Sequence, residues 1–304
     1  MAAAWRAAGH EVQVLADTGA TPAPADGMLV QYVPFLYGRR GLSRAPERLM
    51  RAARAHRTRV VLFVHEPWVP PTRLPWLLLS PLQRRQLRRL VRLADVTVTA
   101  VPAWQRQLGP AVDVHYVGST LGPPPEDVGT PLAAPAVFSP FASGLAWDWI
   151  LAAVERINTD PPLTVLGTDR AGLAGFTPLR SADMRRWDVR GRLGGAATLA
   201  LLAAAPLVLA PFVDGLTGRR TSAAAALSAG ARVVTSLGPL ADATLLAGAA
   251  GVAASRSDFA GLAFALWHRP DDAGARAQRL RWYQTHLDPA ALDARMARYL
   301  LEGA

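Results

Sequence analysis

The stretch from Leu207 to Ser236 reads LVLAPFVDGLTGRRTSAAAALSAGARVVTS, and it decides the fold class. The apolar run 207–210 predicts a buried strand, and Ser222–Ala229 predicts a helix. A second apolar run, Arg232–Thr235, predicts the next strand. A strand, a helix and a strand in this order build a parallel sheet with helices on its faces. The polar loop 214–221 then lies between the first strand and the helix.

This loop carries groups that suit a phosphate. Arg219 and Arg220 directly precede the helix, and Thr221 and Ser222 can donate hydroxyl groups or cap it. A helix N-terminus offers free N–H donors and about half a positive charge. Ligands of open parallel sheets bind at the carboxyl ends of strands. We therefore expect a diphosphate site here; the competing interpretation is a capped core helix with two solvated arginines.

The same alternation of strands and helices covers the rest of the chain. A stretch rich in Gly and Pro, 118–135, is the best linker candidate. We expect an α/β protein with an N-terminal domain, 1–130, a C-terminal domain, 131–285, and a last helix, 286–304. Two α/β domains joined by a Pro-rich stretch would have a cleft between them. Other strands are expected at 12–15, 59–64, 95–99, 112–117, 136–138 and 163–166, and other helices at 1–8, 80–93, 147–157, 196–205 and within 270–301.

Composition excludes several kinds of chemistry. The 304 residues contain no cysteine, and all 33 basic residues are arginines. Thiolate sites and lysine Schiff bases are therefore excluded. The most apolar stretch, 196–213, is interrupted by Pro206 and Pro211, and the N-terminus lacks the apolar core of a signal peptide. We expect a soluble cytoplasmic protein.

The net charge of +10 is concentrated in the first half of the chain. Fourteen arginines lie between Arg39 and Arg92, against only Glu47 and Glu66. The helix around Arg88 could meet anionic lipid headgroups or a lipid-phosphate acceptor, which predicts peripheral contact with the inner membrane face. The alternative is a solvated helix face. No nucleic-acid module accompanies the charge, so no nucleic-acid partner is expected.

A second candidate site is the pair His65 and Glu66, which follows the strongest predicted strand. A histidine there can bond a substrate or act as an acid or base, or it can simply be a satisfied histidine at a strand end. The six histidines show no metal-ligand spacing, so no metal is expected. No Gly-x-Gly-x-x-Gly and no Gly-x-Ser-x-Gly motif occurs.

The order strand, Pro, Asp-Gly-x-x-x-Arg-Arg-x-Ser, Ala-rich helix, Val-Val-Thr resembles the donor-site signature of bacterial GT-B glycosyltransferases of group 1, family 4-like. The stretches Ala8–Val14, Val60–Glu66 and Ala229–Val234 are similar to that family in the expected order. The resemblance implies two Rossmann-like domains, with the last helix, 286–304, packing back toward the N-terminal domain. It also implies the transfer of a sugar from a nucleotide-diphospho-sugar, independent of a metal or cofactor and with retention of anomeric configuration. The acceptor would be a sugar, a lipid-linked molecule or another small molecule.

The resemblance also implies roles for individual residues. His65 and Glu66 would be catalytic groups of the N-terminal domain. The residues that would bind the donor are Asp214, Gly215, Thr217, Arg219, Arg220, Thr221 and Ser222.

Several departures favour a different outcome. Thr217 and Ala225 stand where most members of the family carry two glutamates, and 139–143 stands where a basic pair is usual. The chain also opens inside the family's first helix, without the strand and Gly-rich loop that precede it there. The alternative is therefore a non-catalytic or degenerate GT-B-like protein that binds a nucleotide sugar or a partner. A nucleotide-sugar epimerase would need an acid and base pair that we do not find.

Overall fold

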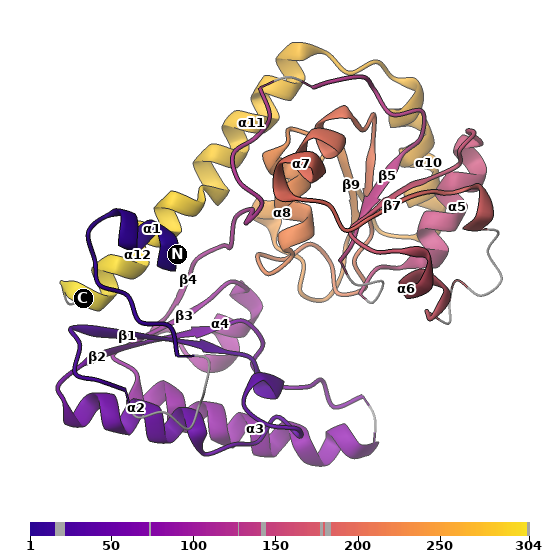
Figure 1. Ribbon diagram of the computed structural model, residues 1–304. Coiled ribbons are helices and arrows are strands. Elements are labelled where there is room, and N and C mark those ends of the chain that lie inside the picture. Colours follow the sequence, from indigo (N-terminus) through magenta and orange to yellow (C-terminus); the bar gives the residue numbers. More distant parts are fainter. Residues whose placement is uncertain are drawn as a thin grey trace. The chain divides into compact units, whose positions relative to one another are not determined.

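The computed structural model describes residues 1–302 except 16–21, 73, 127, 141–143, 177–178 and 180–183 (Figure 1). The chain forms two compact units. Unit 1 consists of Met1–Tyr116 and Ala290–Ala304, and unit 2 consists of Val117–Pro289. The chain therefore passes from one unit to the other twice.

Unit 1 contains a sheet of four parallel strands in the order β1 (Gly27–Tyr32), β2 (Arg59–Val64), β3 (Val96–Thr99) and β4 (Val112–Val114). Every residue of β2 except Arg59 is buried, as expected for a strand covered on both faces. The helices of this unit are α1 (Ala2–Ala7), the 3-10 helix η1 (Pro34–Leu36), α2 (Ala45–Ala55), α3 (Leu74–Leu93), α4 (Pro102–Leu108) and α12 (Pro289–Leu301).

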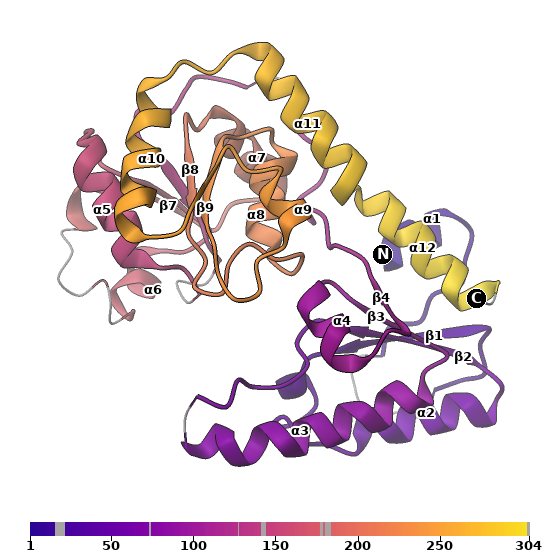
Figure 2. The ribbon, with the colours of Figure 1, turned by 180° about the vertical axis from the view of Figure 1, so that it is seen from behind.

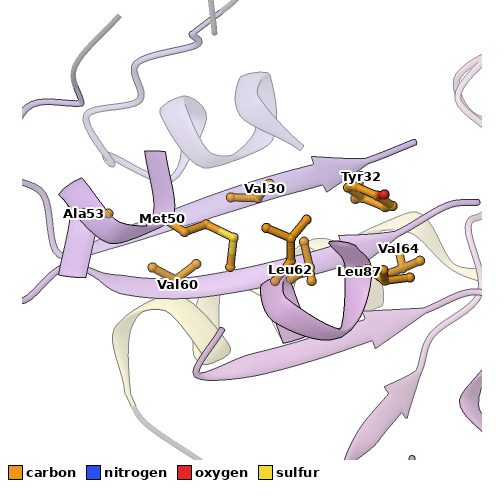
Figure 3. Packing of buried hydrophobic residues seen from close by; sticks show 9 residues of the cluster. Val30, Tyr32, Met50, Ala53, Val60, Leu62, Val64 and Leu87 are labelled. Carbon is orange, nitrogen blue, oxygen red and sulfur yellow. The ribbon is translucent and has the colours of Figure 1, made fainter. Parts of the chain in front are cut away.

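One face of this sheet forms a core with α2 and α3 (Figure 3). Alternate residues of a strand point to the same face, so Val60, Leu62 and Val64 meet the helices together. Met50 of α2 and Leu87 of α3 pack on them, and both side chains have no exposed surface.

The last helix belongs to unit 1 by its contacts. A Cβ atom placed on Gly27 of β1 would lie 2.7 Å from Cβ of Leu300. The Tyr299 hydroxyl donates to the Asp113 carboxylate, and the His115 ring lies 3.1 Å from the same hydroxyl. The end of the chain thus closes over strands that are formed much earlier in the sequence.

Unit 2 contains a six-stranded parallel sheet. Its strands are β5 (Ala136–Phe138), β6 (Thr164–Leu166), β7 (Asp188–Gly191), β8 (Val208–Ala210), β9 (Val233–Ser236) and β10 (Gly251–Ala253), in the order β10-β9-β8-β5-β6-β7. The helices are α5 (Trp147–Ile157), α6 (Arg170–Ala174), η3 (Met184–Arg186), α7 (Gly195–Ala204), α8 (Thr221–Ser228), α9 (Ala243–Leu246), α10 (Arg256–His268) and α11 (Ala273–Leu287). Figures 1 and 2 show α5 and α10 on one side of the sheet and α7, α8 and α11 on the other.

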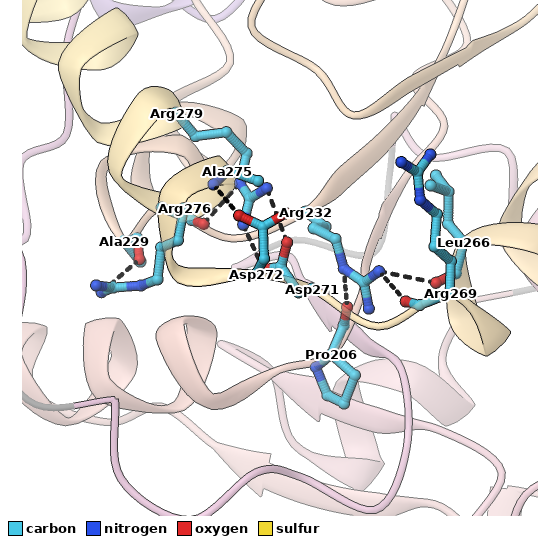
Figure 4. A network of polar contacts seen from close by, with 11 residues as sticks. Pro206, Ala229, Arg232, Leu266, Arg269, Asp271, Asp272, Ala275, Arg276 and Arg279 are labelled. Atoms are coloured by element: carbon cyan, nitrogen blue, oxygen red, sulfur yellow. Dashed lines mark hydrogen bonds and ion pairs between the residues drawn. The ribbon is translucent and has the colours of Figure 1, made fainter.

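A network of arginines fixes the C-terminal end of α8 (Figure 4). Arg276 and Arg279 of α11 donate to the carbonyl oxygens of Ala229 and Gly230, at 3.2 and 2.9 Å. Cations at a helix C-terminus are favourable because the last carbonyls carry partial negative charge. Arg279 also pairs with Asp271, at 2.5 Å.

The buried Arg232 makes a second set of arginine–carbonyl bonds nearby (Figure 4). Its guanidinium donates to the carbonyl oxygens of Pro206, Leu266 and Arg269, at 2.8, 2.9 and 2.6 Å. It therefore joins three chain segments that are distant in sequence.

Most of the predicted elements are present, and two predictions are wrong. The strand expected at 12–15 does not form: Val14 is 65% exposed, and the Val12 carbonyl accepts from Arg6 at 2.7 Å. Alternating apolar residues make a strand only beside a hydrogen-bonding partner, and β1 pairs with β2 instead. The helix expected from Ser80 begins at Leu74 and runs through Pro81. Pro81 is exposed, so water can bind the carbonyl that its ring leaves without a donor.

The units divide at residues 116/117 and 289/290, not at the expected 130/131 and 285/286. The stretch after Tyr116 is bonded into unit 2. The Val117 N–H donates to the Gly218 carbonyl at 3.2 Å, and the Ser119 N–H donates to the Tyr283 hydroxyl at 2.8 Å. Residues rich in Gly and Pro therefore pack here as part of a domain.

Candidate functional site

The loop between β8 and α8, residues 211–220, is the centre of the candidate site. We name it the donor loop, after the role that the family resemblance predicts for it. Its backbone is held on two sides. The Ala146 N–H donates to the Pro211 carbonyl at 2.8 Å, and the Leu240 N–H donates to the Asp214 carbonyl at 3.0 Å. A loop fixed in this way can present side chains in one arrangement.

Two glycines allow the loops after β8 and β9 to touch through their backbones. Gly215 has φ +88°, in the left-handed region that favours glycine. A Cβ atom at Gly238 would lie only 2.3 Å from the Gly215 nitrogen. Side chains at these positions would separate the two loops. The close contact between the loops therefore explains the glycine at position 215 without any ligand.

The acidic group of the donor loop pairs with both of its arginines. Asp214 accepts from Arg219 through one carboxylate oxygen and from Arg220 through the other. The three side chains are each only about one fifth exposed. Two guanidinium groups and one carboxylate leave this cluster with a net positive charge.

Burial by itself would raise the pKa of Asp214. The guanidinium groups of Arg220 and Arg219 outweigh that effect, and the pKa of Asp214 is lowered below its usual value. Asp214 is therefore ionised at neutral pH, and it orients the arginines.

Arg220 is fixed further by its neighbours. Its guanidinium carbon lies 4.7 Å from the centre of the Phe212 ring, within the range of a cation–π contact. A Cβ atom at Gly144 would lie 3.0 Å from its Nη1 atom. Arg220 thus lies in a narrow space beside the start of α8.

The start of α8 faces the same cluster. Arg220 is the N-cap residue, and none of the described residues caps the helix with a side-chain hydrogen bond. The first N–H groups of an α-helix have no acceptor within the helix, so Ser222 and Ala223 can donate out of it. Thr221 and Ser222 remain partly accessible, unlike Ala223–Ser228, which are buried. Their hydroxyl groups add donors at the positive end of the helix.

Thr217 and Ala225, the two positions where the family resemblance expects glutamates, are buried at 2% and 1% exposure. The Thr217 hydroxyl oxygen has no hydrogen-bond partner among the described residues. The donor loop therefore contributes hydroxyl and guanidinium donors, with Asp214 as its one carboxylate.

A pocket of about 510 Å³ adjoins the donor loop at Phe212. Apolar side chains dominate its wall, and the Ser236 hydroxyl within it already donates to the Phe212 carbonyl at 2.7 Å. This pocket suits an apolar group. Its other lining residues are Leu145, Ala146, Trp147, Asp148, Trp149, Leu151, Val213 and Leu237.

His65 and Glu66 lie in unit 1, at the carboxyl end of β2. The N–H groups of both residues donate to the Tyr32 carbonyl at the end of β1, at 2.9 and 3.5 Å. The centre of the His65 ring lies 4.5 Å from that of Phe63, with the two rings tilted by 31°, and its Nε2 atom is hydrogen-bonded to the Gln31 side-chain oxygen. With that oxygen as the acceptor, Nε2 carries the proton and Nδ1 keeps its lone pair.

Burial lowers the pKa of His65 to about 4. The ring is neutral at pH 7, so it can accept a proton or a hydrogen bond at Nδ1 but carries no charge. A neutral histidine in this position suits hydrogen bonding to a hydroxyl group better than pairing with a phosphate.

The structure gathers the predicted site residues into two groups. Asp214, Gly215, Thr217 and Arg219–Ser222 form the donor loop and helix start of unit 2, and His65 and Glu66 form the strand end in unit 1. Sequence reasoning missed Gln31, which bonds His65. Its signal was a single polar residue in the apolar run 28–33. Of the expected segment 139–143, residues 141–143 lie outside the described residues.

Within the described part of the chain, no group of three or more His, Asp or Glu side chains could hold a metal ion. The same residues include no helix that is both long enough and apolar enough to cross a membrane.

No family model and no curated protein matches this chain by sequence. Solved structures do match its fold. HepE from Anabaena in complex with UDP shares 18% identity with a TM-score of 0.61, over 86% of this chain and 77% of that one. WaaG, a glycosyltransferase involved in lipopolysaccharide biosynthesis, shares 15% identity with a TM-score of 0.61, over 87% and 84%.

The pneumococcal O-GlcNAc transferase GtfA, solved with UDP and GlcNAc, shares 12% identity with a TM-score of 0.58. The match covers 83% of this chain and 54% of the GtfA chain, so this chain spans about half the length of GtfA. At these identities the likeness concerns the fold.

Proposed function

From the GT-B fold that the chain shares with these structures, we propose that the protein is a glycosyltransferase that moves a sugar from a nucleotide-diphospho-sugar to an acceptor. The observation that supports this most is the donor loop. It places two guanidinium groups, two hydroxyl groups and a helix N-terminus at the carboxyl end of β8, where open parallel sheets bind their ligands. Four of the matching structures contain UDP or UDP-glucose, so a uridine nucleotide is the first donor to test.

The chemistry follows from the charges. When the bond between the sugar carbon and the diphosphate oxygen breaks, the electron pair stays on the oxygen, and negative charge grows there. Arg219, Arg220 and the N–H groups at the start of α8 would stabilise that charge. Two guanidinium groups can perform the charge neutralisation that other enzymes assign to a divalent cation, so we propose a metal-independent transfer.

His65 is proposed to act on the sugar side. Its neutral ring can accept a hydrogen bond from a hydroxyl group of the donor sugar or the acceptor, and Glu66 would orient that group. We further propose retention of anomeric configuration. The acceptor, which is a sugar, a lipid-linked molecule or another small molecule, stays a prediction.

A thermal-shift panel with UDP, GDP, ADP and TDP tests the donor site. Linkage gives about 2.7 kcal/mol of stabilisation when a ligand is present at a hundredfold excess over its dissociation constant. The variant Arg219→Ala/Arg220→Ala should lose the shift, because each charge-assisted hydrogen bond is worth about 1.5–3 kcal/mol. The variant Arg256→Ala/Arg281→Ala removes two exposed arginines of the same unit and should keep it. No shift with any of the four nucleotides would overturn the donor-site proposal.

A second candidate is a non-catalytic protein that binds a nucleotide sugar, and the buried Thr217 and Ala225 favour it. The two candidates differ in turnover. If UDP shifts the melting temperature but no UDP-sugar is hydrolysed or transferred over days, the result supports the binding function and contradicts the transferase function.

A further inference from the structure

The outer face of α3 changes character along the helix. The first half exposes leucines, with Leu74 at 79% and Leu78 at 74%. The second half exposes arginines. Positions 74, 78, 85 and 92 lie within about 40° of one another around the axis, so one continuous face is apolar at its start and basic at its end. The exposed residues of this face are Leu74, Leu77, Leu78, Leu82, Arg85, Arg88, Arg89 and Arg92.

The opposite face of α3 packs against the rest of unit 1. Leu87 and Leu90 belong to its core, and the Gln83 side-chain oxygen accepts from the Val69 N–H at 2.8 Å. The leucines are therefore exposed although the helix is anchored. In Figures 1 and 2 the first turns of α3, next to the grey trace, extend beyond the end of the four-stranded sheet.

A second exposed segment of the same composition is tied to α3. Phe35 and Leu36 of η1 are 48% and 62% exposed, and Arg39 and Arg40 follow them. The Gln83 amide donates to the Arg40 carbonyl at 3.1 Å. We call these four residues, together with the outer face of α3, the leucine–arginine surface. No acidic residue occurs in 34–44 or 74–93.

We propose that the leucine–arginine surface docks on an anionic lipid bilayer. The leucines and Phe35 would enter the boundary between headgroups and acyl chains, and the arginines would pair with lipid phosphates. Arginine suits this place because its apolar stem can lie along the bilayer while the guanidinium binds phosphate bidentately. Because the leucines occupy only the first half, the helix would enter tilted, with its N-terminal end deepest.

Other occupants fit less well. A second copy packed on the leucines about a two-fold axis would leave the arginines without a counter-charge, because this surface contains no acidic residue. A nucleic acid would match the charge, but its backbone would leave the leucines in water. Only a surface that is apolar inside and anionic outside satisfies both halves of the helix.

The test is vesicle flotation of the full chain without nucleotide, so its result is independent of the proposed transferase activity. Vesicles of phosphatidylcholine with 30% phosphatidylglycerol should bind the protein, and pure phosphatidylcholine should bind it much more weakly (the lipid fraction is roughly that of strongly anionic membranes). The variant Arg88→Ser/Arg89→Ser should bind about 25-fold more weakly, at about fivefold for each arginine. The variant Leu74→Ser/Leu78→Ser should bind at least about tenfold more weakly.

Two matched variants serve as controls. Arg256→Ser/Arg281→Ser removes the same charge from exposed positions in unit 2, and Val252→Ser/Leu301→Ser removes exposed apolar groups outside the surface. Both should bind like the parent protein. Equal binding by the surface variants and their controls would overturn the proposal, and so would a failure of the parent protein to float. Loss of a dimer in the leucine variant, without vesicle binding by the parent, would assign the surface to a second copy instead.

Discussion

The two ends of helix α8 both carry arginines, but these arginines bond to different groups. At the C-terminal end, Arg232, Arg276 and Arg279 donate to backbone carbonyl oxygens. At the N-terminal end, Arg219 and Arg220 pair with the carboxylate of Asp214. Carbonyl oxygens cannot leave the network without disrupting the fold, whereas a carboxylate shared by two guanidinium groups can be supplemented by an incoming anion. The difference separates arginines that hold the structure from the arginines that we propose bind the diphosphate.

The largest expected effect concerns Arg232, just after the C-terminal end of α8. Arg232→Ala removes the donor from three carbonyl groups, and a buried acceptor without a partner costs about 1–3 kcal/mol. We expect a loss of about 3 kcal/mol in the free energy of unfolding, measured by urea denaturation, with unchanged nucleotide affinity. Arg256→Ala, at an exposed position, should cost less than about 0.5 kcal/mol. A loss of nucleotide affinity in a stably folded Arg232→Ala protein would show that Arg232 does more than hold the structure.

The next effect concerns His65, a buried group that unit 1 keeps neutral. Its pKa in the folded protein is about 4, below the usual 6.5, so the unfolded chain takes up the proton first as the pH falls. The contribution of the neutral His65 ring to the free energy of unfolding is therefore complete above pH 6.5 and is lost between pH 6.5 and 4. Between pH 7 and 5 this amounts to about 2 kcal/mol.

The variant His65→Gln should lose that pH dependence, and His56→Gln, at an exposed position, should retain it. Urea denaturation at several pH values measures both. An unchanged slope in His65→Gln would show that another group carries the acid sensitivity of unit 1.

The smallest expected effect concerns Asp214, beside the N-terminal end of α8. The pKa of Asp214 is lowered, so its contribution to stability is present above the usual carboxyl pKa and is lost as the pH falls through the lower folded value. Asp214→Asn should cost about 1 kcal/mol at pH 7, and progressively less as the pH falls below the usual carboxyl pKa. Its nucleotide affinity should be kept or increased, because the arginines lose a competing anion. A clear loss of affinity, measured by calorimetry, would mean that Asp214 is needed to aim the guanidinium groups.

Elements with strong local signals were predictable from the sequence. The run Arg59–Val64 is β2 to the residue, and Trp147–Ile157 is α5 to the residue. The donor loop was predictable because strand, loop and helix are continuous in the chain. The strand β1 was missed, because Gly27 and Gln31 interrupt its apolar pattern and only its pairing with β2 establishes it.

Contacts between distant residues were not predictable. The pairing of Asp214 with two arginines depends on how the loop closes. The bond between Gln31 and His65 depends on the register of β1 beside β2. The exposure of Leu74 and Leu78 could not be foreseen while the helix was expected to begin at Ser80, because these leucines then lay outside it.

The discontinuity of unit 1 has a consequence for its biosynthesis. Ribosomes add about 5–20 residues per second, so α12 emerges roughly ten to forty seconds after the sheet of unit 1 is complete. During that interval β1 lacks Leu300 over Gly27, and Asp113 lacks Tyr299. Unit 2, whose residues are consecutive in the chain, can complete its contacts first. The nascent chain therefore passes through a stage in which the sheet of unit 1 lacks the helix that closes over it, and unit 1 then relies on its own partial stability.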